Sequence, residues 1–195
     1  MHLDISRTHR AFSALAGRDP EIITREFREI DLFKRYEKGL INDESFRHQL
    51  QAFLRTDAGD DQLDEARNAM LLDIPPARVK LLKQLRGKYI LFLLSNTNAI
   101  HVRQVNQILR QTSSITSLED LFDRTFYSHQ VGMSKPAPEV FRYVLDHARI
   151  QAEETLFLDD SPDYLRSAQQ TGIPSVLIEP THTILYLFAD APTED

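Results

Sequence analysis

The 195-residue sequence predicts an α/β fold in which a parallel sheet follows an N-terminal helical unit. Two observations carry this prediction. Residues 1–74 show amphipathic helical patterns and no clear strand, whereas residues 75–195 alternate short apolar runs with helical patterns. Apolar runs that are each followed by a helix are typical of parallel strands buried on both faces. We therefore expect two units, with a boundary near residue 74.

Helix start signals mark the elements of the N-terminal unit. Asp19 precedes Pro20 and the amphipathic stretch EIITREFREI, which is the pattern of a capping residue and a proline in the first helical turn. Asn42 or Asp43 opens the stretch NDESFRHQLQAFL, whose apolar residues fall on one helical face. Packing within the unit explains these apolar stripes without any ligand.

Four apolar runs predict the strands of the second unit. The predicted strands are YILFLL (89–94), TFYS (125–128), TLFL (155–158) and SVLI (175–178). A helical pattern precedes the first run and separates the others, and Gly172 is a plausible stop for the last of these helices. Parallel sheets bind ligands beyond the carboxyl ends of their strands, so the polar residues there are the candidates for a site.

Composition excludes several function classes. The net charge is −6 and no basic stripe occurs, which argues against nucleic acid or an anionic membrane surface as a partner. No apolar run approaches the roughly 20 residues of a membrane span. The chain has no cysteine, which excludes disulfides and thiolate metal sites and fits a cytoplasmic location. The seven histidines show no metal-ligand spacing.

Three polar groups follow successive predicted strands. Ser95 and Asn96 follow the first, Lys135 lies in the loop after the second, and Asp159 and Asp160 follow the third. A hydroxyl beside backbone N–H groups suits phosphate oxygens, and a lysine can neutralise a phosphoryl group. Two adjacent carboxylates suit a hard cation such as Mg²⁺. The combination predicts a site for a metal ion and a phosphate.

Each group also has an explanation without a ligand. The Ser95–Asn96 pair could cap the following helix, and Lys135 could be a solvated surface lysine. The Asp159–Asp160 pair could form a turn, and Asp163 could be an acid that favours the helix dipole. The order of the three groups, each behind a strand, favours the site.

Three stretches resemble the later motifs of the haloacid dehalogenase (HAD) superfamily. LFLLSNTN is similar to the second motif, GMSKPAPEVF to the third, and TLFLDDSPDYLRSAQQTGIPSVLI to the fourth. The stretch YEKGLINDESFRHQL resembles the small helical cap of one branch of the superfamily. The resemblance implies a Rossmann-like, HAD-like core over residues 75–195 and a helical cap over residues 1–74.

The resemblance also implies an activity. The expected function is that of a Mg²⁺-dependent phosphatase of small phosphorylated metabolites, with sugar phosphates among the candidates, through an aspartyl-phosphate intermediate. Carried over onto this chain, Ser95 and Lys135 would be catalytic residues that contact the transferring phosphoryl group, and Asn96 would position it. Asp160 would bind Mg²⁺ directly, Asp159 would act on the metal through water or as a supporting partner, and Asp163 would orient the loop.

One departure from the superfamily pattern concerns the nucleophile. The first motif is an apolar strand that ends in the nucleophilic aspartate, and no such strand is present here. The opening MHLDISRTH resembles the segment that normally lies just after that motif, and Asp4 lies too near the start to end a strand. We therefore expect the chain as given to lack a central strand and to be inactive. The alternatives are a non-catalytic protein that binds phosphate or a partner, and a 2-haloacid dehalogenase-like hydrolase, which would need no metal.

Overall fold

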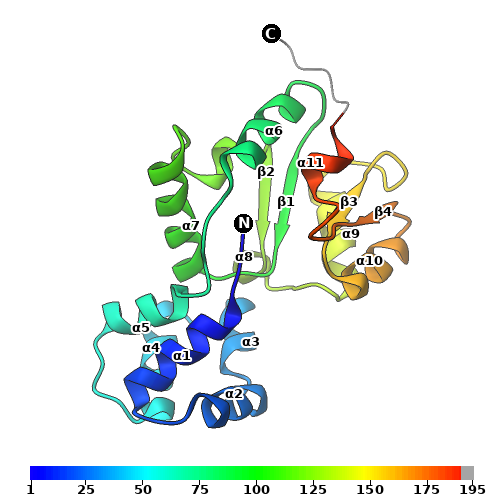
Figure 1. Ribbon diagram of the computed structural model, residues 1–195. Coiled ribbons are helices and arrows are strands. Elements are labelled where there is room, and N and C mark those ends of the chain that lie inside the picture. The colour runs from blue at the N-terminus through cyan, green and yellow to red at the C-terminus, as the bar shows by residue number, and fades with distance from the viewer. Residues whose placement is uncertain (190–195) are drawn as a thin grey trace.

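The computed structural model describes residues 1–189 and places a helical cap beneath a core of strands and helices (Figure 1). The cap consists of α1 (Ile5–Ala16), α2 (Pro20–Glu29), α3 (Leu32–Glu37), α4 (Asp43–Leu54) and α5 (Asp60–Asn68). The Asp19 carboxylate accepts hydrogen bonds from the first backbone N–H groups of α2, and the Asn42 side chain does the same for α4. Both predicted start signals are therefore confirmed, Asn42 rather than Asp43 being the cap of α4.

The cap has its own hydrophobic centre. Phe12, Ile23, Leu50 and Leu54 are each 0% exposed and form one cluster. Phe27 packs edge-on against neighbouring rings, including that of Phe33 at 4.8 Å between centroids. Each helix contributes one apolar stripe, as the sequence pattern predicts.

The core begins at α6 (Pro76–Arg86) and carries four short strands, β1 (Phe92–Ser95), β2 (Arg124–Tyr127), β3 (Phe157–Asp159) and β4 (Ser175–Leu177). The other elements are α7 (Ala99–Thr112), η1 (Leu118–Asp120), α8 (Ser128–Val131), α9 (Pro138–Ala148), α10 (Pro162–Gln169) and α11 (Ile184–Leu187). Between residues 6 and 72 the only β-type pairing in the described chain is an isolated antiparallel bridge from Leu71 to Leu3. None of the described helices is long and apolar enough to cross a bilayer.

The strand bounds differ from the predicted ones, most clearly at the first strand. The strand predicted over 89–94 spans Phe92–Ser95, because the Tyr89 N–H bonds to the carbonyl of Leu85 and stays in the turn that ends α6. Tyr89 and Ile90 are accordingly 58% and 68% exposed. The strands predicted over 125–128, 155–158 and 175–178 are found with shifts of one or two residues.

Strand pairing is parallel, but the strands form two separate pairs. β1 pairs with β2, with Phe92 opposite Arg124 and Ser95 opposite Tyr127. β3 pairs with β4, with Phe157 opposite Ser175. No described strand joins the two pairs, so the single sheet implied by the apolar pattern is divided into two. Parallel strands are confirmed, and one continuous sheet is not.

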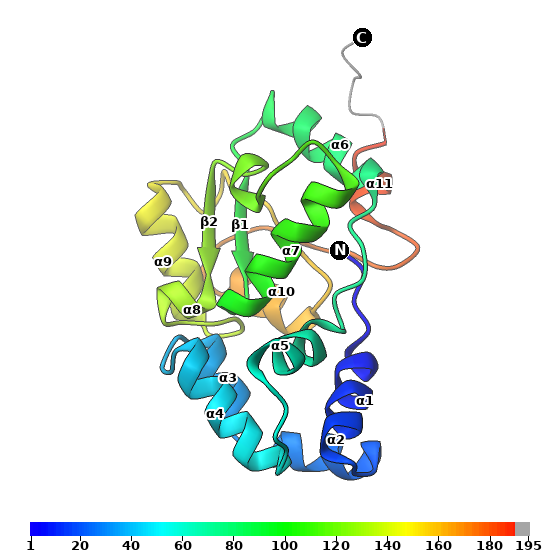
Figure 2. The ribbon, with the colours of Figure 1, turned by 90° about the vertical axis from the view of Figure 1, so that its left-hand side faces the viewer.

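Helices cover the strands on both sides (Figure 2). Val79 of α6 and Ile108 and Leu109 of α7 form one buried cluster. Val140 of α9 and Ala168 of α10 form another, against which Leu94 of β1 and Phe157 of β3 both pack. This second cluster therefore links the two strand pairs through side chains.

Two of the contacts between the cap and the core involve their backbones directly. The segment around His2 lies beside the segment around Leu72, whose N–H bonds to the carbonyl of His2 at 3.1 Å. The turn at Gly39, which has φ +67°, lies against α8, where an added Cβ would be 2.0 Å from the His129 carbonyl oxygen. Only glycine allows this approach of the cap to the core.

Candidate functional site

The carboxyl ends of β1 and β2 point toward the cap (Figure 1). Ser95 ends β1 and Asn96 follows it, Lys135 lies in the loop after α8, and Asp159 ends β3. The Asn96 side chain is hydrogen-bonded to the backbone of Lys135, a residue 39 positions later in the chain. The Lys135 N–H donates to Asn96 Oδ1 at 2.9 Å, and Asn96 Nδ2 donates to the Lys135 carbonyl at 2.8 Å. Asn96 therefore fixes the loop that carries the lysine.

Lys135 forms a buried ion pair with Asp159. Lys135 Nζ lies 2.6 Å from Asp159 Oδ2, and the two side chains are only 8% and 10% exposed. The ammonium also lies 4.9 Å from the ring centroid of Tyr164 and 5.4 Å from that of Phe157. Aromatic faces attract cations, so this ammonium is held by a carboxylate and two rings. The surface-lysine alternative is wrong for Lys135.

Two further predicted residues offer groups without protein partners. Ser95 ends β1, and its hydroxyl makes no hydrogen bond within the described part of the chain. Asp160 is exposed and likewise has no hydrogen bond or ion pair among residues 1–189. Both groups are available to a ligand.

The helix-capping alternative for Ser95–Asn96 is also wrong. Asn98 caps α7 instead, with its Oδ1 accepting from the His101 N–H at 3.0 Å. The turn explanation for Asp159–Asp160 accounts for one oxygen of Asp159, since its Oδ1 accepts a hydrogen bond from the Ser161 N–H at 2.9 Å. Asp163 lies in the first turn of α10 and pairs with Arg166 in solvent, so the structure does not bring it to Lys135.

The donor set fits a magnesium ion that keeps part of its water shell. Mg²⁺ is usually bound by one or two protein carboxylates together with waters and phosphate oxygens. The Asp160 carboxylate makes no hydrogen bond or ion pair within residues 1–189, although its charge acts on the Met1 ammonium, whereas both oxygens of Asp159 already accept hydrogen bonds. Within residues 1–189 no group of three or more potential ligands among His, Cys, Asp and Glu occurs. The chain therefore offers Asp160 as a direct ligand and Asp159 as its neighbour.

Tyr164 belongs to the site but was not predicted. Its phenol oxygen accepts a hydrogen bond from Asn96 Nδ2 at 3.3 Å, and its ring contacts the Lys135 ammonium. Burial, followed by the negative charge of Asp159, raises the pKa of Tyr164. The signal that could have found it is an aromatic residue one turn into the helix that follows Asp159 and Asp160.

A family model described as haloacid dehalogenase-like hydrolase matches residues 5–172. The chain belongs to this family. A HAD family enzyme from Bacteroides thetaiotaomicron, solved in complex with magnesium and inorganic phosphate, superposes with a TM-score of 0.86. It is 34% identical in sequence, and the match covers 96% of this chain and 92% of that one.

Two relatives of this HAD-like hydrolase are named as phosphatases. D-ribitol-5-phosphate phosphatase of Bacteroides thetaiotaomicron is 25% identical over 87% of this chain and 82% of its own length. A sesquiterpene phosphatase of Aspergillus oryzae is 28% identical over 73% of this chain and 70% of its own length. The predicted membership of the HAD superfamily and the predicted fold class are thereby confirmed.

Proposed function

We propose that this HAD-like hydrolase is a Mg²⁺-dependent phosphatase of small phosphate monoesters, with sugar or polyol phosphates among its substrates. The observation that carries the proposal is the buried Lys135–Asp159 pair at 2.6 Å, beside the free hydroxyl of Ser95 and the free carboxylate of Asp160. Magnesium-bound and phosphatase-named relatives support it.

Each residue has a proposed role in phosphoryl transfer. Lys135 and Ser95 bind the phosphoryl oxygens, and Asn96 holds the lysine loop in place. Asp160 binds Mg²⁺, which would neutralise phosphoryl charge when bound. Asp159 orients the ammonium of Lys135. Such positioning and charge neutralisation account for most of the catalysis of phosphoryl transfer.

Neither Asp159 nor Asp4 is available as the nucleophilic carboxylate, because both already accept hydrogen bonds from other groups. Asp159 is engaged by Lys135 and Ser161, and Asp4 caps α1 with its carboxylate bonded to Ser6. We propose that the nucleophilic aspartate comes from a further strand placed between the two strand pairs. The aspartate would attack phosphorus as the bond from phosphorus to the ester oxygen breaks, and the leaving alkoxide would take a proton from solvent water. Water would then hydrolyse the aspartyl-phosphate, releasing inorganic phosphate and restoring the aspartate.

A paired activity assay tests this proposal. The 195-residue chain is compared with a fusion that adds an apolar strand ending in aspartate before Met1. Hydrolysis of p-nitrophenyl phosphate is measured with and without Mg²⁺. We expect Mg²⁺-dependent turnover from the fusion and little from the shorter chain. Turnover by the shorter chain that is lost on Lys135→Ala would contradict the account of the nucleophile and point to another carboxylate.

A binding experiment tests the metal site without turnover. Millimolar Mg²⁺ should raise the melting temperature of the chain, because a ligand that binds only the folded state stabilises it. Asp160→Asn should remove this shift, whereas Asp146→Asn on α9 makes the same charge change at an exposed residue and should keep it. Equal shifts in all three proteins would exclude Asp160 as the ligand.

The second candidate is a protein that binds phosphate without hydrolysing it. The engagement of Asp159 and Asp4 by other groups favours it. Phosphate binding that depends on Lys135, with no turnover by either the chain or the fusion, would support this candidate. Release of chloride from 2-chloropropionate without Mg²⁺ would instead indicate a dehalogenase.

A further inference from the structure

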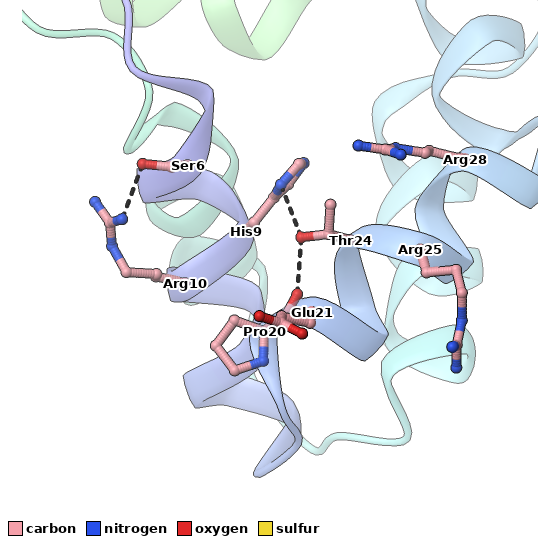
Figure 3. A pocket seen from close by; sticks show the side chains of 8 residues that line it. All are labelled: Ser6, His9, Arg10, Pro20, Glu21, Thr24, Arg25 and Arg28. Atoms are coloured by element: carbon pink, nitrogen blue, oxygen red, sulfur yellow. Dashed lines mark hydrogen bonds between the residues drawn. The ribbon is translucent and has the colours of Figure 1, made fainter.

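A cleft lies in the cap between α1 and α2 (Figure 3). Its volume is about 450 Å³, enough for a small ligand. It is lined by Ser6, His9, Arg10, Pro20, Glu21, Thr24, Arg25 and Arg28. The lining holds three arginines and one glutamate, although the whole chain carries a net charge of −6.

The arginines of the cap cleft differ in how far they are neutralised. Arg10 donates to Ser6 Oγ at 2.8 Å and lies 3.7 Å from the Asp4 carboxylate. Arg28 has no hydrogen bond or ion pair within residues 1–189. In Figure 3 its guanidinium extends toward His9. Arg28 is therefore a cation without a protein counter-ion at the cleft.

The cap cleft continues into a smaller inner pocket of about 180 Å³. His9, Thr24 and Arg28 line both spaces, and the inner pocket adds Arg67 of α5. Arg67 is 7% exposed, and its buried Nε has no hydrogen-bond partner. A buried N–H donor without an acceptor is costly, so this atom marks a place for a ligand oxygen.

The other groups at the junction of the two spaces do not compete for an anion. His9 shares a hydrogen bond with the Thr24 hydroxyl at 3.0 Å. Burial, followed by the charges of Arg28 and Arg67, lowers the pKa of His9. The histidine is thus neutral near pH 7, and Arg28 carries the unpaired positive charge, because the guanidinium of Arg67 is already paired with Glu37 at 2.9 Å.

We propose that the cap cleft binds a small oxyanion, a carboxylate or a phosphate, with Arg28 and the Nε of Arg67 as its donors. Guanidinium groups match the geometry of both anions and form charge-assisted hydrogen bonds with them.

An ion pair, an electrostatic effect and hydrogen bonds link the surroundings of this anion site with those of Lys135. Arg67 Nη2 lies 2.9 Å from Glu37, and the charge of Glu37 contributes to the raised pKa of Tyr164. Tyr164 in turn accepts from Asn96, which holds the lysine loop. One source of the anion is a second charged group on the ester whose phosphate is bound at Lys135. This source rests on the proposed function. The other source is a separate small anion.

Isothermal titration calorimetry with three probes separates these sources. The probes are 6-phosphogluconate, sorbitol 6-phosphate, which lacks the carboxylate, and gluconate, which lacks the phosphate. One charge-assisted contact should make the native chain bind 6-phosphogluconate about tenfold more tightly than sorbitol 6-phosphate. Arg28→Gln should remove the preference, whereas Arg142→Gln makes the same change at an exposed residue of α9 and should keep it. Unfolding curves confirm that each variant is folded.

The results assign the source of the anion. If gluconate alone binds equally to the native chain and to Lys135→Ala, but not to Arg28→Gln, the cleft takes a separate anion. If only 6-phosphogluconate depends on Arg28, the anion belongs to the ester. The inference is overturned if no probe binds through Arg28, that is, if Arg28→Gln and Arg142→Gln bind all three probes alike. The proposed function fails separately, if Lys135→Ala leaves the binding of sorbitol 6-phosphate unchanged.

Discussion

The cap and the core differ in how fully their apolar side chains are buried and their strands or helices are hydrogen-bonded. In the cap, Phe12, Leu50 and Leu54 are fully buried, and side chains of Asp4, Asp19 and Asn42 cap three helices. In the core, Leu156 before β3 is 50% exposed, and the four described strands form two pairs that no strand hydrogen bonding joins. Helices satisfy their backbone hydrogen bonds internally, whereas a strand depends on its neighbours. The helices of the cap therefore satisfy their own hydrogen bonds and bury one apolar cluster. In the core, polar side-chain contacts hold the loops at the strand ends in place.

The largest expected effect comes from breaking the polar anchor of the core. Lys135→Ala leaves the Asp159 carboxylate buried without its cation, and such changes typically cost about 3–5 kcal/mol of the free energy of unfolding. Urea denaturation measures the loss. The double variant Lys135→Met, Asp159→Leu should recover most of it, because no unpaired charge remains. If Lys135→Ala alone costs less than about 1 kcal/mol, the pair is not an anchor of the core.

A matched pair of leucine truncations compares the apolar packing of the two units. Leu50→Ala in the cap removes a side chain that is 0% exposed and should cost about 3 kcal/mol, through lost burial and a cavity. Leu156→Ala in the core removes a half-exposed side chain and should cost under about 1 kcal/mol. Thermal and urea unfolding measure both. Equal losses would mean that the core is packed as tightly as the cap.

The junction between the two units should be sensitive to acid. His101 of α7 contacts the carbonyl of Arg67 at 3.2 Å, and burial, with a contribution from the charge of Arg67, lowers the pKa of His101 to about 3. The unfolded chain binds this proton below about pH 6.5, and the folded chain binds it only near pH 3. Stability should therefore fall as the pH drops below about 6.5, by roughly 1.4 kcal/mol per pH unit.

The control for this pH effect is the variant His101→Gln. Burial also lowers the pKa values of His9 and His129, which add to the same slope. The difference between the native chain and His101→Gln from about pH 6.5 to about pH 5 isolates the one histidine. Identical slopes in that range would show that His101 is not a neutral buried residue.

Much of the local structure could be predicted from the sequence. The division into a helical and an alternating half, the caps at Asp19 and Asn42, and the polar residues behind three strands all follow from patterns within a few residues. Such signals act within one helical turn or one strand, where backbone hydrogen bonds and apolar faces are decided by near neighbours.

The site itself depended on contacts between distant segments. Asn96 and Lys135 are 39 residues apart, and no pattern within a few residues of either indicates that the Asn96 amide is hydrogen-bonded to the backbone of Lys135. The same holds for Arg28 and Arg67, which line one pocket from two helices. For Lys135 and Arg67 burial decided these outcomes, since a lysine or arginine withdrawn from water needs a carboxylate, a ring or a ligand oxygen beside it, and only the packed chain determines which of these is near.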